Sequence, residues 1–234
     1  RLCRMKVLYP ELIPYYLERL IPCIPITLKI VGWSLLFGLI FGILLALAEI
    51  RRIPVLSQLS KFYISFMRGT PINIQLYIVY FGIPAILSGF FRMISFDINN
   101  ADPMFFVVVT YSLNNAGFMA ILIKSAVLGV EKGQTEAGYA IGLTRFQTFT
   151  NIVAPQAIRI AIPDFQNILV NLVKNTSLAY ILGIIDIMGK VSIINTRTYR
   201  SVEGYISSAI IYFVISMMIE MLFGFLTKKQ KAWT

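Results

Sequence analysis

Long apolar runs separated by short polar connections fill most of the chain. The runs cover residues 25–49, 57–87, 103–128, 152–185 and 205–226, and Arg68-Gly69-Thr70-Pro71 interrupts the second. A helix needs about 20 apolar residues to cross a hydrocarbon core of about 30 Å. The pattern therefore predicts an all-α membrane protein with about five transmembrane helices, forming one membrane domain over residues 25–227.

Two flanking segments differ from these runs. Residues 1–24 contain prolines and glutamates that suit no span, so we expect an extracytoplasmic or interfacial segment there. Residues 228–234 contain three lysines and are expected to form a basic cytoplasmic tail. No internal repeat is found between them.

Composition supports the bilayer as solvent. The chain has 234 residues, 57% of them hydrophobic and 14% charged, with a mean hydropathy of +0.75 and a net charge of +10. Soluble domains have about 25% charged residues. Since the basic residues lie between or beside the apolar runs, we expect them to reflect orientation in the membrane and not binding of nucleic acid.

Basic residues flank the first and third connections and the end of the chain: Arg51, Arg52, Lys61, Lys132, Arg145, Lys228, Lys229 and Lys231. The positive-inside rule then predicts that these parts are cytoplasmic and that the N-terminus lies outside. Other basic residues run against this orientation: Arg1, Arg4, Lys6, Arg19, Lys190, Arg197 and Arg200.

Several kinds of chemistry are missing from the sequence. There is no histidine, and two cysteines are too few for a disulfide framework. The chain has no Gly-x-x-x-x-Gly-Lys-[Ser/Thr] segment of the kind that binds nucleotide phosphates, and no paired carboxylates for acid–base work. We therefore expect neither an active site nor a bound cofactor or metal in this chain.

The connection between the third and fourth runs, residues 129–155, carries a spaced motif. It has Glu136-Ala137-Gly138, three residues, Gly142, nine residues, and then Ile152-Val153-Ala154-Pro155. This resembles the EAA loop of ABC importer permeases, Glu-Ala-Ala, three residues, Gly, nine residues, Ile-x-Leu-Pro. Gly138 and Ala154 depart from that pattern. The resemblance implies a type I ABC importer fold with a cytoplasmic coupling helix.

The residue types in this loop fit docking onto a soluble partner. We expect a helix to start near Gly133 with Glu136 close to the positive end of its dipole, Gly142 to permit a sharp turn, and Pro155 to interrupt the hydrogen-bond ladder. The candidate coupling residues are Gln134, Glu136, Ala137, Gly138, Gly142, Leu143 and Pro155. The alternative is an amphipathic surface helix that only joins two spans.

The resemblance extends over most of the chain from about residue 26. Residues 62–76, 131–145 and 155–179 are similar to the polar amino acid branch of these permeases, and "LVKNTSLA" with "INTRT" is most similar to cystine-type members. This implies two ATP-binding subunits that hold ATP and Mg, a second permease copy or a paralogue, and an extracytoplasmic amino-acid-binding protein. Ile121 stands where many members have Glu.

Polar side chains recur along the fourth run at steps of three and four residues, which places them on one helix face. They are Asp164, Asn167, Asn171, Lys174 and Asn175. Because such groups are costly against lipid, we expect them to face the bundle interior or a water-filled path. Lys174 could bind the carboxylate of an amino acid and Asp164 or the asparagines its ammonium. The alternative is hydrogen bonding that only joins helices.

The interruption of the second run is a further candidate for the path, with Arg68, Thr70 and Gln75 as its site residues and Asn73 beside them. Broken helices at membrane depth usually line cavities or are buried in protein. Arg68 could instead pair with lipid phosphate or with Glu49.

Two other classes of protein compete with the permease interpretation. An ion-coupled secondary transporter would usually show an internal repeat, and the chain lacks a buried carboxylate pair for ion coupling. A membrane enzyme or structural subunit is the other class, but the absence of histidine, of a usable cysteine pair and of paired carboxylates leaves little for catalysis. Glu220 in the fifth run is expected to be a near-surface acid paired with Lys228 or Arg52.

Overall fold

The computed structural model describes residues 8–93 and 97–231, and over these residues the chain is helical, with no strand. Among the described residues, four helices are long and apolar enough to cross a membrane: Pro10–Ile50, Ile72–Gly89, Pro103–Leu128 and Ser201–Phe225. Arg145–Leu182 and Ile187–Thr198 make a fifth span if they are counted together across a bend of 50°. The predicted all-α architecture with about five spans is confirmed.

The helix that contains the first span begins well before the predicted start of that span at residue 25. Four helical pieces follow one another without a break: η1 (Pro10–Leu12), α1 (Ile13–Leu20), η2 (Ile21–Cys23) and α2 (Ile24–Ile50). Each has a proline in one of its first two positions. A proline is tolerated there because its missing N–H would have no partner within that turn. The prolines of residues 10–25 are therefore compatible with a continuous helix.

The close contact between α2 and α5 (Pro103–Leu128) depends on two glycines of α2. A Cβ atom at Gly38 would lie 2.9 Å from Asn115 Cβ, and one at Gly42 would lie 2.6 Å from Met119 Cβ. The two glycines are four residues apart and so face the same side of the helix. Gly38-x-x-x-Gly42 is thus a small-residue packing motif of the kind that joins membrane helices.

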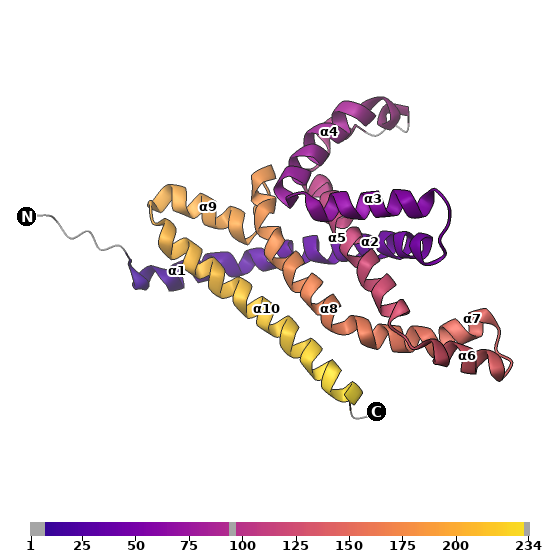
Figure 1. The fold of residues 1–234 in the computed structure, drawn as a ribbon. Coiled ribbons are helices and arrows are strands. Elements are labelled where there is room, and N and C mark those ends of the chain that lie inside the picture. Colours follow the sequence, from indigo (N-terminus) through magenta and orange to yellow (C-terminus); the bar gives the residue numbers. More distant parts are fainter. Residues whose placement is uncertain (1–7, 94–96, 232–234) are drawn as a thin grey trace, which may run out of the picture.

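The second predicted span divides into two helices of different character. α3 (Leu56–Gly69) is amphipathic and exposes Leu59 and Phe62, whereas α4 (Ile72–Met93) contains the apolar stretch long enough to cross a membrane. In Figure 1, α3 runs beside α2 and α4 turns away from both. The prediction of one broken span over residues 57–87 is therefore wrong, because the break separates an amphipathic helix from the span.

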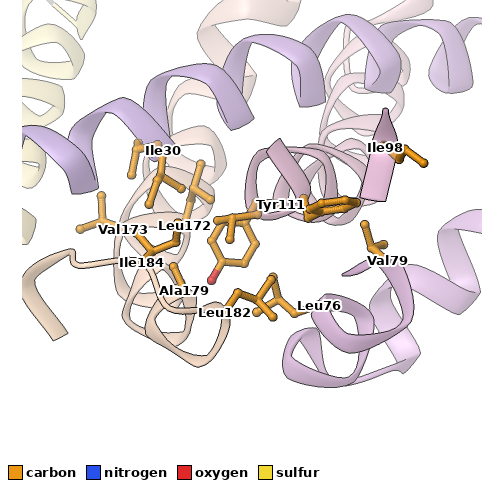
Figure 2. Packing of buried hydrophobic residues seen from close by; sticks show 13 residues of the cluster. Ile30, Leu76, Val79, Ile98, Tyr111, Leu172, Val173, Ala179, Leu182 and Ile184 are labelled. Carbon is orange, nitrogen blue, oxygen red and sulfur yellow. The ribbon is translucent and has the colours of Figure 1, made fainter. Parts of the chain in front are cut away.

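The main core lies where α2, α4, α5, α8 (Ala154–Asn175) and η5 (Thr176–Leu182) meet, and Figure 2 shows Tyr111 at its centre. Leu76 and Val79 come from α4, and Leu172 and Val173 come from α8. The Tyr111 hydroxyl donates to the backbone oxygen of Asn175 at 2.7 Å, where α8 ends. This buried contact satisfies a helix-terminal carbonyl and fixes α8 against α5.

At the other end of the first span, α1 packs against α9 (Ile187–Thr198) and α10 (Ser201–Lys231). The buried Tyr16 hydroxyl lies 2.8 Å from Thr198 Oγ1, 2.8 Å from the Arg200 backbone oxygen and 3.2 Å from Asn195 Oδ1. These contacts join α1 to α9 and to the connection between α9 and α10.

The α10 helix continues through Lys231, beyond the boundary expected at residue 227. The basic tail therefore begins as helix. Arg1, Arg4 and Lys6 lie outside the described residues.

Candidate functional site

The loop with the spaced motif forms a helical hairpin that projects from one end of the bundle (Figure 1). α6 (Lys132–Ala140) is followed by a turn and by α7 (Arg145–Thr148), which leads through a π-helical segment, Phe149–Val153, into α8. α6 starts one residue earlier than predicted, with Glu131 as its N-cap and no acidic residue in its first turn. Glu136 lies beyond that turn, so its expected place near the positive end of the dipole is wrong.

The predicted turn at Gly142 is confirmed. Its φ is +84°, in the left-handed region that disfavours side chains with a Cβ atom. Gly142 N donates to Tyr139 O at 3.0 Å and Leu143 N donates to Gly138 O at 3.1 Å, which resembles a Schellman end of α6. Apart from its two chain neighbours, no described residue has an atom within 4 Å of a Cβ built at Gly142, so backbone conformation, not crowding, requires glycine there.

A capping box then starts α7. Gln147 N donates to Thr144 Oγ1 at 3.3 Å, and Thr144 N donates to Gln147 Oε1 at 2.9 Å. The signal, a Thr followed three residues later by Gln, was present in the sequence but was not singled out there.

Gly138 is buried inside the hairpin and not on its outer surface. A Cβ atom at this position would lie 2.7 Å from Thr148 Cγ2 and 2.9 Å from Ile152 Cδ1. Gly138 therefore lets α6 pack against the segment after α7. The predicted coupling role of Gly138 stays a prediction, and its burial means that such a role would act through the shape of the hairpin.

The hydrogen-bond ladder is irregular beside Pro155, as predicted, but the helix does not end there. Pro155 lies in the first turn of α8, directly after the π-helical segment, and the helix continues from Arg145 to Leu182. A π-type turn is a known way to absorb an irregular hydrogen-bond pattern within a helix. Gln156 Nε2 also donates to Ile152 O at 3.0 Å and lies 3.4 Å from Gln134 Oε1, which ties α8 to α6.

The outer surface of the hairpin is more apolar than the sequence analysis recognised. Ile141 and Phe146 are each 75% exposed and Tyr139 is 47% exposed, while Glu136 and Ala137 are exposed beside them. Exposed apolar groups clustered at a protruding element are typical of a protein-binding surface. Their signal in the sequence was the presence of large apolar residues within a short connection. We call Tyr139, Ile141 and Phe146 the hairpin face.

The polar residues of α8 share one face, as predicted. Asp164, Asn167, Asn171 and Lys174 are exposed and Asn175 is half-buried. On the α5 side this face borders a cavity of about 190 Å³ that Asn171 and Asn175 line together with Asn114 and Asn115. On the α10 side it borders a groove of about 570 Å³. Within the described residues the face is therefore open and polar.

Lys174 of α8 and Glu220 of α10 line this same groove, together with Tyr212 and Ser216 of α10. The Ser216 hydroxyl oxygen is buried and has no hydrogen-bond partner among the described residues. Over the described residues, Glu220 forms no ion pair with Arg52, so the predicted Glu220–Arg52 pair is wrong. The Lys228 side chain lies outside the described residues.

At the break between α3 and α4, Gln75 is 3% exposed and holds the break closed. Its amide nitrogen donates to Met67 O at 2.9 Å and to Thr70 Oγ1 at 2.7 Å, and its amide oxygen accepts from Asn114 Nδ2 at 3.0 Å. Gln75 does not line an open path in this structure, because its polar atoms are used within the chain.

Arg68 is exposed, and its guanidinium lies 5.5 Å from the centre of the Phe118 ring. Glu49, its alternative partner in the sequence analysis, instead forms an ion pair with Lys124 of α5. The Glu49 side chain is 6% exposed and that of Lys124 is 37% exposed. This pair joins residues 75 positions apart, which is why the sequence did not reveal it. No group of metal-ligating side chains occurs over residues 8–93 and 97–231.

The fold and the hairpin define an ABC importer permease. Residues 38–232 match the family described as "Binding-protein-dependent transport system inner membrane component", and the chain belongs to that family. It is thus a permease subunit of an amino acid ABC importer, a multi-pass inner-membrane protein that is not itself an enzyme. This membership decides against the ion-coupled transporter and the membrane enzyme.

One similar protein is the L-cystine transport system permease protein TcyL of Bacillus subtilis (strain 168), 42% identical over 208 residues, which are 89% of this chain and 85% of TcyL. The probable amino-acid ABC transporter permease protein PatM of Vibrio harveyi is 35% identical over 89% of this chain and 88% of PatM.

Among solved structures, an amino acid ABC transporter crystallised with histidines superimposes with a TM-score of 0.79 at 25% identity, covering 96% of this chain and all of that one. The methionine ABC transporter MetNI, in an inward-facing conformation, gives 0.68 at 18% identity over 91% of this chain and 96% of its own. The second likeness concerns the fold alone.

Proposed function

We propose that this chain is the permease subunit of an ATP-driven importer for cystine or a related polar amino acid. The name of the 42% identical relative, an L-cystine transport permease, supports this substrate class. Two ATP-binding subunits would hold ATP and Mg, a second copy of this chain or a paralogue would complete the permease pair, and an extracytoplasmic binding protein would deliver the amino acid.

The single observation that best supports ATP coupling is the hairpin face. An apolar, exposed surface on a rigidly capped hairpin suits insertion into a groove of a soluble subunit. Because α7 and the π-helical segment continue into α8, a movement of the hairpin would reach the polar face of α8 without passing through a flexible loop. The hairpin and the basic α2–α3 connection would face the cytoplasm, and α1 the outside.

The polar face of α8 is our candidate for the translocation path. Its side chains cannot face lipid cheaply, so they would line a water-filled space between two permease subunits. Lys174 would bind the substrate carboxylate, and Asp164, the asparagines of α8 or Glu220 would bind its ammonium group. Arg68 and Thr70 at the α3–α4 break would border this path, and Gln75 would reach it only if the break opens.

The docking assignment is tested by co-purification with the ATP-binding subunit in mild detergent. Phe146→Asp and Gly142→Asp should each lose that subunit and remain inserted in the membrane. Tyr199→Asp is the matched control, because Tyr199 is 89% exposed on the α9–α10 connection, away from the hairpin. Retention of the ATP-binding subunit by Phe146→Asp would overturn the assignment.

The path assignment is tested by ATP hydrolysis stimulated with cystine and the binding protein. Lys174→Met should abolish the stimulation and leave basal hydrolysis and subunit assembly unchanged, whereas Lys174→Arg should keep part of it. Equal stimulation of Lys174→Met and the parent protein would show that the α8 face only joins helices.

A further inference from the structure

A polar pocket of about 550 Å³ lies where α2 ends, α3 begins and α5 ends, away from the polar face of α8. Its charged lining residues are Glu49, Arg52, Lys61 and Lys124, and Ser57 and Gln58 add polar groups. The pocket therefore has three cationic side chains against one carboxylate.

These charges do not cancel within the chain. Lys124 is paired with Glu49, but the Arg52 guanidinium and the Lys61 ammonium have neither an ion pair nor a side-chain hydrogen bond among the described residues. Arg52 is exposed, and so is Lys61. Two free cations at one pocket favour an anionic ligand, and a guanidinium suits a phosphate group because it can donate two parallel hydrogen bonds.

The connection that holds Arg52 has an unusual backbone. Arg52 and Val55 have φ values of +51° and +65°, in a region that residues other than glycine rarely adopt. Leu56 N donates to Pro54 O at 2.7 Å, so Pro54–Leu56 is a γ-turn with positive φ, a rare and strained type. Such strain persists where the surrounding structure fixes it, often at binding sites.

The rim of the pocket is apolar. Its apolar lining residues are Ile50, Ile53, Pro54 and Leu128, and of these Ile53 is 38% exposed and Leu128 at the end of α5 is 64% exposed. A ligand that combines an anionic group with hydrocarbon would satisfy both the cations and this rim. A free phosphate or a nucleotide would leave the rim in water.

We propose that this pocket binds the headgroup of an anionic phospholipid in the leaflet on the side of the coupling hairpin. Arg52 and Lys61 contact the phosphate, and the acyl chains lie along the exposed Ile53 and Leu128 side chains of the rim. Basic pockets between membrane helices on the cytoplasmic side recognise such headgroups. Because Leu128 precedes the hairpin by a few residues, a bound lipid would hold the base of the hairpin against α2 and α3. The proposal does not depend on which amino acid is transported.

The full chain, assembled with its partner subunits, is reconstituted in nanodiscs of phosphatidylcholine containing a minor fraction of phosphatidylglycerol. Lipids retained after transfer to mild detergent are counted by native mass spectrometry. The Arg52→Gln/Lys61→Gln variant should retain phosphatidylglycerol at least about fivefold less than the parent, since each basic group near an anionic surface contributes about that factor. Lys29→Gln/Arg197→Gln removes the same charge outside the pocket and should retain it normally.

Two further measurements keep the test decisive. Arg52→Lys keeps the charge and should keep most of the retention, and Lys61→Gln alone serves if the double variant fails to fold. The proposal is overturned if the parent shows no preference for phosphatidylglycerol or if the control variant loses it equally. It is also overturned if inorganic phosphate or ATP displaces the lipid, or if the pocket variant instead loses the ATP-binding subunit in detergent.

Discussion

Replacing Gly138 by valine should uncouple the hairpin without preventing insertion of the chain into the membrane. A Cβ atom at Gly138 would lie 2.7 Å from Thr148 Cγ2, and Thr148 is 1% exposed, so it has little room to move. Carbon atoms in contact prefer about 3.5–4.0 Å, so the two segments must separate by about 1 Å.

The cost of this change follows from packing. Overpacking of a tight contact costs about 1–3 kcal/mol, and valine carries two methyl groups beyond Cβ, which places it in the upper part of that range. The better helix propensity of valine over glycine offsets only about 0.4 kcal/mol. A net loss of about 2 kcal/mol lowers the equilibrium constant for packing of the hairpin by a factor of about 30.

The assay is ATP hydrolysis stimulated by substrate and binding protein, with assembly followed by co-purification. Gly133→Val is the matched control, because Gly133 lies in the same helix and a Cβ there has no atom within 4 Å. Gly138→Val should lose at least about four-fifths of the stimulation, and Thr148→Ala in the same chain should restore part of it. If Gly138→Val and Gly133→Val behave alike, the packing role of Gly138 is refuted.

Three further predictions concern stability, measured as thermal unfolding in detergent. Gly42→Ala should destabilise the α2–α5 contact by about 1–3 kcal/mol. Gly32→Ala is the control and should leave stability unchanged, because no atom of another segment lies within 4 Å of the new Cβ. Equal effects of the two substitutions would contradict the close packing at Gly42. Tyr16→Phe should cost about 1–3 kcal/mol because it leaves buried acceptors unpaired, and Tyr15→Phe, at a 37% exposed ring, should be neutral. Lys124→Gln should cost about 1–3 kcal/mol, because it leaves the carboxylate of its partner on α2 unpaired. This is less than the roughly 3–5 kcal/mol for a fully buried pair, since the lysine is 37% exposed. An unchanged unfolding temperature would show that the pair does not stabilise the fold.

The features predictable from sequence are those that depend on local pattern. Apolar run length revealed the spans, and the glycine spacing of the hairpin revealed the turn at Gly142. The burial of Gly138 was not predictable, because it depends on which face of α6 meets Thr148. The Glu49–Lys124 pair joins two helices whose contact no local pattern encodes. The break between α3 and α4 was visible in the sequence at Arg68-Gly69-Thr70-Pro71, but its consequence was not, because hydropathy averaged over the run does not separate the amphipathic α3 from the apolar α4.

The contacts of Tyr16 also have a consequence for how the chain is made. Its hydroxyl meets Thr198, which is synthesised 182 residues later. At a translation rate of about 5–20 residues per second, the tyrosine waits roughly 10–40 s for that partner. Until then α1 carries a hydroxyl group that has no hydrogen-bond partner within its own helix. Both ends of the bundle have therefore assembled once the hydrogen bonds of Tyr16 are complete. A chain truncated before α9 would keep the Tyr16 hydroxyl without these partners, and cellular quality control could detect it.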